Sequence, residues 1–132
     1  MSKILRKYCL DTHPLVWYLT GQKTLSPKAK QALDDIFFQK NVCFISAIVF
    51  LELFHLSLKH KKFIFPQLLN KLRLTNIVVV PLDKIVLRTC YQLPKELNIH
   101  DRVICATAKV NNCVLVTKDK EIGKYSGLKI YW

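Results

Sequence analysis

Short apolar runs rich in β-branched residues alternate with longer segments of helical character along the whole chain. Strand-like runs are expected at 6–10, 42–45, 77–80 and 114–116, with a further short run at 128–131. Strands that alternate with predicted helices imply right-handed crossovers and a parallel sheet. The predicted fold class is therefore α/β, with a parallel central sheet flanked by helices on both faces.

Capping residues mark where the intervening helices begin. Ser26-Pro27 combines an N-cap with a proline at the first helical position. Ser46 precedes a helix over about 47–59 that is apolar on nearly every side, and we expect this helix to be buried. Asp101 is expected to start a helix that ends at Asn111-Asn112. Shorter helices are expected at 13–21, 66–72 and 83–94.

The length and the cysteine pattern narrow the class of protein. A chain of 132 residues fits one domain, which we place at 1–132. The five cysteines are widely separated and form no C-x-x-C motif, so they predict reduced, buried thiols and a cytoplasmic protein. The basic, partly apolar segment 1–10 ends at Asp11, before a signal-peptide core can form. Glu52 and His55 interrupt the most apolar run of the chain, 42–58. We therefore expect no secretion signal and no membrane span.

The formal net charge of +12 indicates a polyanionic partner. Nucleic acid is the first candidate and an anionic membrane the second. A surface that is rich in lysine for solubility alone explains the charge about as well. Charge by itself therefore does not decide the function.

Four of the nine acidic residues occupy unusual places. Asp11 follows the first predicted strand and Asp119 follows the fourth, where ligands collect in open parallel sheets. Asp101 begins the helix that leads into the fourth strand, which puts it at the same edge of the sheet. Glu52 lies inside an apolar helix, where a carboxylate needs a partner or a metal ion. These four acids are thus predicted to converge.

Each acid also has a simpler interpretation. Asp11 and Asp101 are placed to cap helices, and Asp119 suits a turn. Glu52 could pair with His55 or Lys59 on its own helix. Four carboxylates at one edge would repel one another strongly, which favours a site that holds a cation. A donor set made only of oxygen atoms favours Mg²⁺ or Mn²⁺ over zinc.

The local contexts of the four acids form a pattern that covers nearly the whole chain. Its parts are Leu10-Asp11-Thr12-His13, Ser46 with Glu52 six residues on, Asp101-Arg102, Thr117-x-Asp119, and the ending 125–132. This pattern resembles the PIN-domain nucleases, and among them the VapC-type toxins of prokaryotic toxin–antitoxin pairs.

The resemblance implies a single PIN-like α/β/α domain with endoribonuclease activity that depends on Mg²⁺ or Mn²⁺. By position, the acidic site would consist of Asp11, Asp101 and Asp119 as metal ligands, with Glu52 bound directly or through water. Thr12 and Thr117 would be supporting residues that orient the ligands or water. A small antitoxin and a homodimer are the implied protein partners, and RNA is the implied substrate.

One feature departs from the family pattern. The family often has Pro-Phe directly before its third acid, where this chain has Ile99-His100, so the backbone that carries Asp101 need not follow the family. Two other functions stay open at this point. One is a free-standing PIN nuclease that processes RNA or cleaves DNA, and the other is a basic RNA-binding module without catalysis.

Overall fold

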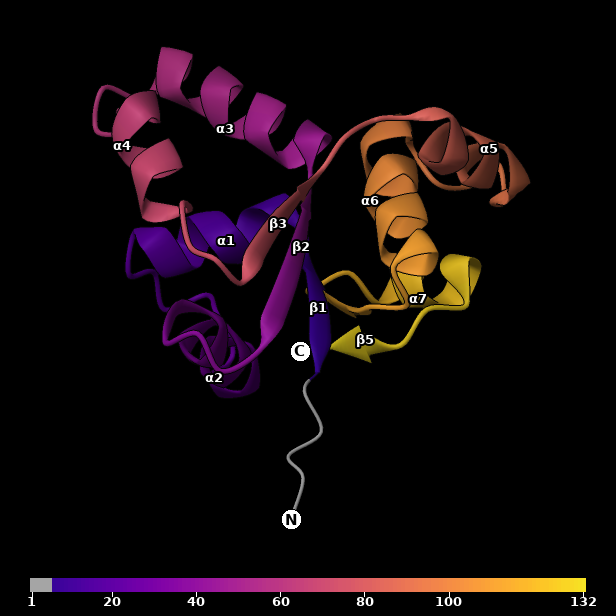
Figure 1. The fold of residues 1–132 in the computed structure, drawn as a ribbon, viewed down its shortest axis with the longest axis horizontal. Coiled ribbons are helices and arrows are strands. Elements are labelled where there is room, and N and C mark those ends of the chain that lie inside the picture. Colours follow the sequence, from indigo (N-terminus) through magenta and orange to yellow (C-terminus); the bar gives the residue numbers. More distant parts are fainter. Residues whose placement is uncertain (1–5) are drawn as a thin grey trace.

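Five parallel strands form the centre of the molecule, in the order β3-β2-β1-β4-β5 (Figure 1). The computed structural model describes residues 6–132. The strands are β1 (Lys7–Leu10), β2 (Val42–Ser46), β3 (Ile77–Val80), β4 (Val114–Val116) and β5 (Ile130–Tyr131). The predicted α/β class with a parallel central sheet is confirmed. We expect no signal peptide in residues 1–10. Residues 1–5 of this segment lie outside the described part of the chain.

Seven helices cover the two faces of this sheet in residues 6–132 (Figure 1). One face carries α1 (Thr12–Leu19), α2 (Pro27–Phe37), α3 (Ala47–Lys59) and α4 (Phe65–Lys71). The other face carries α5 (Lys84–Gln92), α6 (Ile99–Val110) and α7 (Lys120–Ser126). This is the three-layer α/β/α arrangement expected from the sequence.

The register of β1 against β4 positions two polar residues for the site. Leu10 lies opposite Val116, and the Asp11 amide donates to the Val116 carbonyl at 3.1 Å. Both strands end at this point, so Asp11 and Thr117 leave the sheet side by side. The apolar strand residues behind them are fully buried, which gives this edge a rigid base.

The predicted caps Ser26 and Ser46 form, and Asp83 caps the helix that was expected to begin at residue 83. Ser26 accepts a hydrogen bond from the Ala29 amide at 3.0 Å, and Asp83 accepts one from the Val86 amide at 3.0 Å. Ser46 caps α3 through the Ile48 amide at 3.2 Å. The predicted start of α6 is wrong, because Asn98 rather than Asp101 caps this helix. The α7 helix was not predicted.

The prediction that the helix over 47–59 is buried is wrong. In α3 only Val49 and Leu53 are buried, while the Leu51 and Leu58 residues are 59% and 68% exposed. The helix contacts α1, α4 and α6, and much of its surface is left uncovered (Figure 1). An apolar patch of this kind on a protein surface often marks an interaction site.

The five cysteines are buried and free, as predicted from their spacing. Among residues 6–132, no helix combines the length and the apolar character that a membrane crossing requires.

Candidate acidic site

All four predicted acids line one depression of about 340 Å³ at the carboxyl-terminal edge of the sheet. We call it the acidic depression. It lies where α1 and α3 on one face of the sheet meet the start of α6 on the other (Figure 1). Its remaining lining residues are His13, Pro14, Trp17, Asn98, His100, Thr117 and Lys118.

Asp11 is held at the base of this depression by two hydrogen bonds. Its Oδ1 accepts from the Thr12 amide at 2.8 Å, which makes it the N-cap of α1. Its Oδ2 accepts from the Thr117 hydroxyl at 2.8 Å. Burial nevertheless raises the pKa of Asp11, against the lowering effect of these two bonds. Asp11 therefore both caps a helix and carries a charge that is costly to bury.

Thr117 links Asp11 to Asp119. Its side chain is fully buried, and its hydroxyl accepts from the Asp119 amide at 3.1 Å while it donates to Asp11. Asp119 in turn caps α7 by accepting from the Glu121 amide at 2.9 Å. Thr117, which was predicted to be a supporting residue, thus links the end of β1 to the start of α7.

Asp101 lies in the first turn of α6 and is paired with the residue that caps this helix. The Asn98 side chain donates to Asp101 Oδ2 at 2.9 Å and accepts from the Asp101 amide at 2.8 Å. Burial raises the pKa of Asp101, and the negative charges of Asp11, Asp119 and Glu52 raise it further. The four acids are therefore close enough to repel one another.

Glu52 pairs with His100, and not with His55 or Lys59 on its own helix. The His100 Nδ1 and the Glu52 Oε1 are 2.9 Å apart. This contact joins α3 to the start of α6 across the acidic depression. His100 occupies one of the two positions where the sequence departs from the family pattern, so the departure supplies a partner for Glu52.

Arg102 is a supporting residue whose role the sequence did not indicate. Its guanidinium donates to four backbone carbonyls in the segment before α6, those of Cys90, Leu93, Pro94 and Leu97. These bonds fix the chain that ends at Asn98 and hence the position of Asp101. The only available signal was its place directly after an acid in the motif.

The residues of the depression suit a hydrated divalent cation. In residues 6–132, no three His, Cys, Asp or Glu side chains are arranged to hold one metal ion directly. Mg²⁺ commonly binds through one or two carboxylates and keeps several waters. The four acids of the depression offer only oxygen atoms and therefore fit such an ion. Thr12, predicted as a supporting residue, does not line the depression, and its buried hydroxyl has no hydrogen-bond partner among the described protein atoms.

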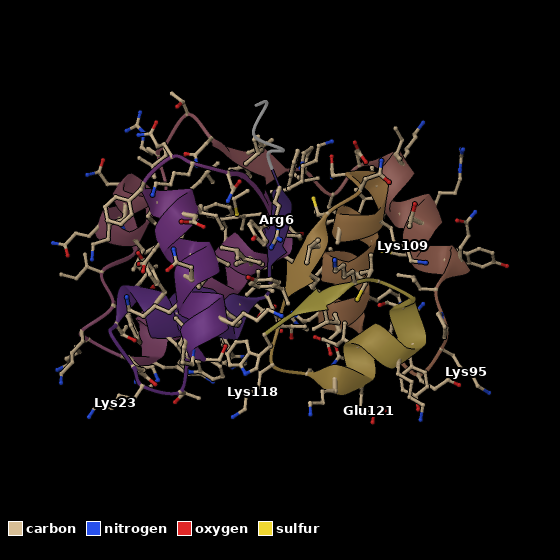
Figure 2. All side chains as sticks on the ribbon, turned by 90° about the horizontal axis from the view of Figure 1, so that it is seen from below. Arg6, Lys23, Lys95, Lys109, Lys118 and Glu121 are labelled. Atoms are coloured by element: carbon tan, nitrogen blue, oxygen red, sulfur yellow. The ribbon has the colours of Figure 1, made fainter. Side chains whose placement is uncertain are left out.

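Aromatic and basic side chains border the acids. Trp17 lines the acidic depression, and the Lys118 ammonium lies 5.9 Å from the centre of its ring. Figure 2 shows Lys118 reaching outward at the margin of the molecule, between the α2 and α7 regions. Tyr18, the next residue on α1, donates its hydroxyl to Asp34 at 2.8 Å and stacks on Phe37.

Comparison with known proteins identifies the fold family. The family model of the PIN domain matches residues 8–128. The VapBC2 crystal structure from Rickettsia felis, bound to a DNA fragment from its promoter, has a TM-score of 0.71 at 21% identity and covers 96% of this chain and 99% of that chain. A toxin–antitoxin complex from Klebsiella pneumoniae has a TM-score of 0.64 at 23% identity, covering 88% of this chain and 89% of that chain.

FitAcB from Neisseria gonorrhoeae has a TM-score of 0.68 at 20% identity, covering 95% of this chain and 96% of that chain. Comparison with curated proteins gave no match. The solved structures share the fold of this chain, and the family model covers most of its length. The chain therefore belongs to the PIN-domain family.

Proposed function

We propose that this protein is a metal-dependent endoribonuclease and the toxin of a toxin–antitoxin pair. The observation that carries the proposal is the convergence of Asp11, Glu52, Asp101 and Asp119 on one depression in a chain of net charge +12. PIN domains are generally nucleases, which supports hydrolysis of a phosphodiester bond. A basic module without catalysis would have no need for four repelling acids in one place.

The metal ligands would be Asp11, Asp101 and Asp119, with Glu52 acting directly or through water. Bound Mg²⁺ or Mn²⁺ would lower the pKa of a water molecule and neutralise charge on the phosphate that it attacks. Thr117 holds the Asp11 carboxylate through its hydroxyl, and Asn98 holds that of Asp101. These bonds limit the motion of the two acids, so little reorganisation is needed when substrate binds.

RNA is the substrate that we propose. Lys118 lines the depression beside the acids and is suited to contact a phosphate. We expect the activated water to attack the phosphorus and the 3′-oxygen to leave, which gives a 5′-phosphate and a 3′-hydroxyl. No 2′,3′-cyclic phosphate should form, because the ribose 2′-hydroxyl takes no part. The free cysteines of the chain are typical of a reducing compartment, which supports action in the cytoplasm.

The test of this function is a cleavage assay on matched single-stranded RNA and DNA, with Mg²⁺ or Mn²⁺ and with a chelator. We expect cleavage of RNA that requires the metal and yields 5′-phosphate ends. Preferential cleavage of DNA would point to a DNA-directed PIN nuclease. Binding of RNA without any cleavage would point to a non-catalytic module.

We further propose two protein partners, a small antitoxin and a second copy of this chain. Structural likeness to a toxin–antitoxin complex supports the first. The exposed Leu51, Phe54 and Leu58 of α3 support the second, since they border a hollow of about 430 Å³ beside Glu52 and His100. Light scattering of the purified chain should give a dimer mass. If an adjacent gene encodes a small protein, co-expression with that protein should suppress cleavage.

Metal binding in the acidic depression should raise the thermal stability of the protein. A carboxyl whose folded pKa is raised contributes stability that is full below its unfolded pKa of about 4 and is lost as pH rises through the folded pKa. The raised pKa values of Asp11 and Asp101 thus imply a penalty in the metal-free protein near neutral pH. Mn²⁺ at 100 times its Kd should add about 2.7 kcal/mol, or roughly 10 °C in Tm.

The matched variant for this prediction is Asp11→Asn. It keeps the volume and the capping oxygen but removes one repelling charge, so without metal it should melt at about the wild-type temperature or higher. On addition of Mn²⁺ its Tm should rise by less than half of the wild-type increase. Equal increases in the two proteins at pH 7 would show that Asp11 is not a ligand.

A further inference from the structure

A second hollow lies away from the acids and is surrounded by positive charge. It has a volume of about 710 Å³ and lies between the end of α1, the end of α3 and α4 (Figure 1). Four lysines line it, and we call it the lysine pocket: Lys59, Lys61, Lys62 and Lys71. His60, Thr20, Gln22 and Gln67 add polar groups to its lining, which contains no carboxylate.

The charge of the lysine pocket is not neutralised by nearby acids. From residue 53 to residue 82 the chain has five lysines and arginines and no aspartate or glutamate. Within residues 6–132, the only ion pair of a lysine or arginine with a carboxylate is Lys30–Asp34 on α2. All four pocket lysines are exposed, so their ammonium groups are available to an anion.

The pocket is also held in shape by the fold. Lys61 and Lys62 occupy the centre of a turn that the Phe63 amide closes by donating to the His60 carbonyl at 2.9 Å. The Phe63 ring packs against the hydrophobic core and meets the His60 ring edge-on, with 5.7 Å between ring centres. The two lysines are therefore presented by an anchored turn.

The lysine pocket and the acidic depression share two helices. On α1, Trp17 lines the depression, whereas Leu19 lines the pocket. On α3, Glu52 lines the depression and Lys59 lines the pocket, about 10 Å further along the helix. At the rise of about 3.4 Å per nucleotide along one strand of a DNA duplex, taken as a guide, this separation corresponds to roughly three nucleotide steps.

We infer that the lysine pocket binds backbone phosphates of the RNA strand whose scissile phosphate lies in the acidic depression. This inference rests on the proposed function, since it assigns the pocket to the same substrate. The pocket attracts phosphates through charge and does not read bases, so it raises the affinity for any strand long enough to reach it. RNA too short to span both sites gains nothing from it.

The test compares two triple variants with the same change in net charge. One is Lys61→Ala, Lys62→Ala and Lys71→Ala in the pocket, and the other is Lys84→Ala, Lys95→Ala and Lys109→Ala. The second set is exposed and lies in the part of the molecule formed by α5 and α6, where Figure 2 shows Lys95 and Lys109. Binding of single-stranded RNA of mixed sequence is measured without metal at rising KCl.

With RNA of roughly 20 nucleotides, the pocket triple should reduce the slope of log affinity against log salt by about 2, at about 0.7 per lost phosphate contact. The control triple should change the slope by much less. A triple Lys→Arg variant of the pocket should keep the wild-type slope. With a dinucleotide, which cannot span the roughly three nucleotide steps between the two sites, all proteins should give the same slope.

Equal slopes for the two alanine triples on long RNA would overturn the inference. A pocket triple that retains the RNA slope but loses binding of a poly-glutamate peptide would also overturn it, and would assign the pocket to an acidic protein. The proposed activity is tested separately. If wild-type protein fails to cleave RNA while only the pocket triple loses salt dependence, the activity is wrong and the pocket stands.

Discussion

We expect Asp11→Asn to reduce RNA cleavage by at least about 100-fold, because changes in the shell around a bound metal alone cost 10- to 100-fold. Asparagine is the informative replacement because its side chain can cap a helix, as Asn98 caps α6. Asn is as good an N-cap as Asp, so the bond from the Thr12 amide can be kept while the negative charge is lost. The rate of RNA cleavage at saturating Mn²⁺, with circular dichroism as a check of folding, measures the effect.

The same substitution distinguishes capping from metal binding at Asp119, which caps α7. Asp119→Asn and Asp101→Asn should lose activity as severely as the Asp11 variant, and Glu52→Gln somewhat less. Asp35→Asn is the matched control, since Asp35 lies on α2 and its side chain accepts from Gln31 on the same helix at 3.0 Å. Full activity in the Asp11, Asp101 and Asp119 variants would leave these acids as caps and turn residues only.

The sequence predicted the edge of the sheet where the acids meet, and the reason is topological. In a parallel sheet every strand ends on the same side as its neighbours, so residues that follow two adjacent strands must be close. Asp11 and Thr117 follow β1 and β4, which pair directly. This inference needs only the strand positions and no knowledge of side-chain geometry.

Other features depend on contacts between distant residues and were not predictable. Glu52 and His100 are 48 positions apart, so local spacing favoured His55 or Lys59 as the partner. The α7 helix was missed because Gly123 lowers its helical propensity. A Cβ atom at Gly123 would lie 2.5 Å from Ile130 Cγ1, so packing against β5 requires glycine there.

The start of α6 and the exposure of α3 show two further limits. Asp101 and Asn98 are both good capping residues three positions apart, and the sequence does not say which of them ends the turn. An apolar helix surface can be covered by the same chain or by a partner, and in α3 the chain covers only part of it. The amino-acid composition of the helix is the same whether the chain itself or a partner covers its surface.

Replacing Arg102 should destabilise the fold more than replacing any other charged side chain described in this structure. Its Nη1 donates to Cys90 at 2.9 Å and Leu93 at 2.8 Å, and its Nη2 donates to Pro94 at 2.6 Å and Leu97 at 3.1 Å. Hydrogen bonds from charged donors contribute about 1.5–3 kcal/mol each, and they are not additive within one group. We expect Arg102→Ala to lower the free energy of unfolding by about 3 kcal/mol.

Urea unfolding followed by circular dichroism measures this loss. At an m-value of about 2 kcal/mol/M, the midpoint should fall by about 1.5 M. Arg102→Lys should recover only part of the loss, because an ammonium group cannot reproduce the planar fork that reaches four carbonyls. Arg88→Ala, on the exposed surface of α5, removes the same charge and should leave the midpoint unchanged.

The Arg102 variants also test how the site is assembled. The segment that Arg102 fixes ends at Asn98, and Asn98 holds Asp101 by two hydrogen bonds. Arg102→Lys, assayed at a temperature where it is fully folded, should therefore cleave RNA more slowly, and the apparent affinity for Mn²⁺ should fall in parallel. If its midpoint falls while its metal affinity and cleavage rate stay at wild-type values, Arg102 stabilises the fold without positioning Asp101. If Arg102→Ala unfolds at the wild-type urea concentration, the four carbonyl bonds contribute no net stability, and the position of Asp101 must depend on the packing of α6 against α5 alone.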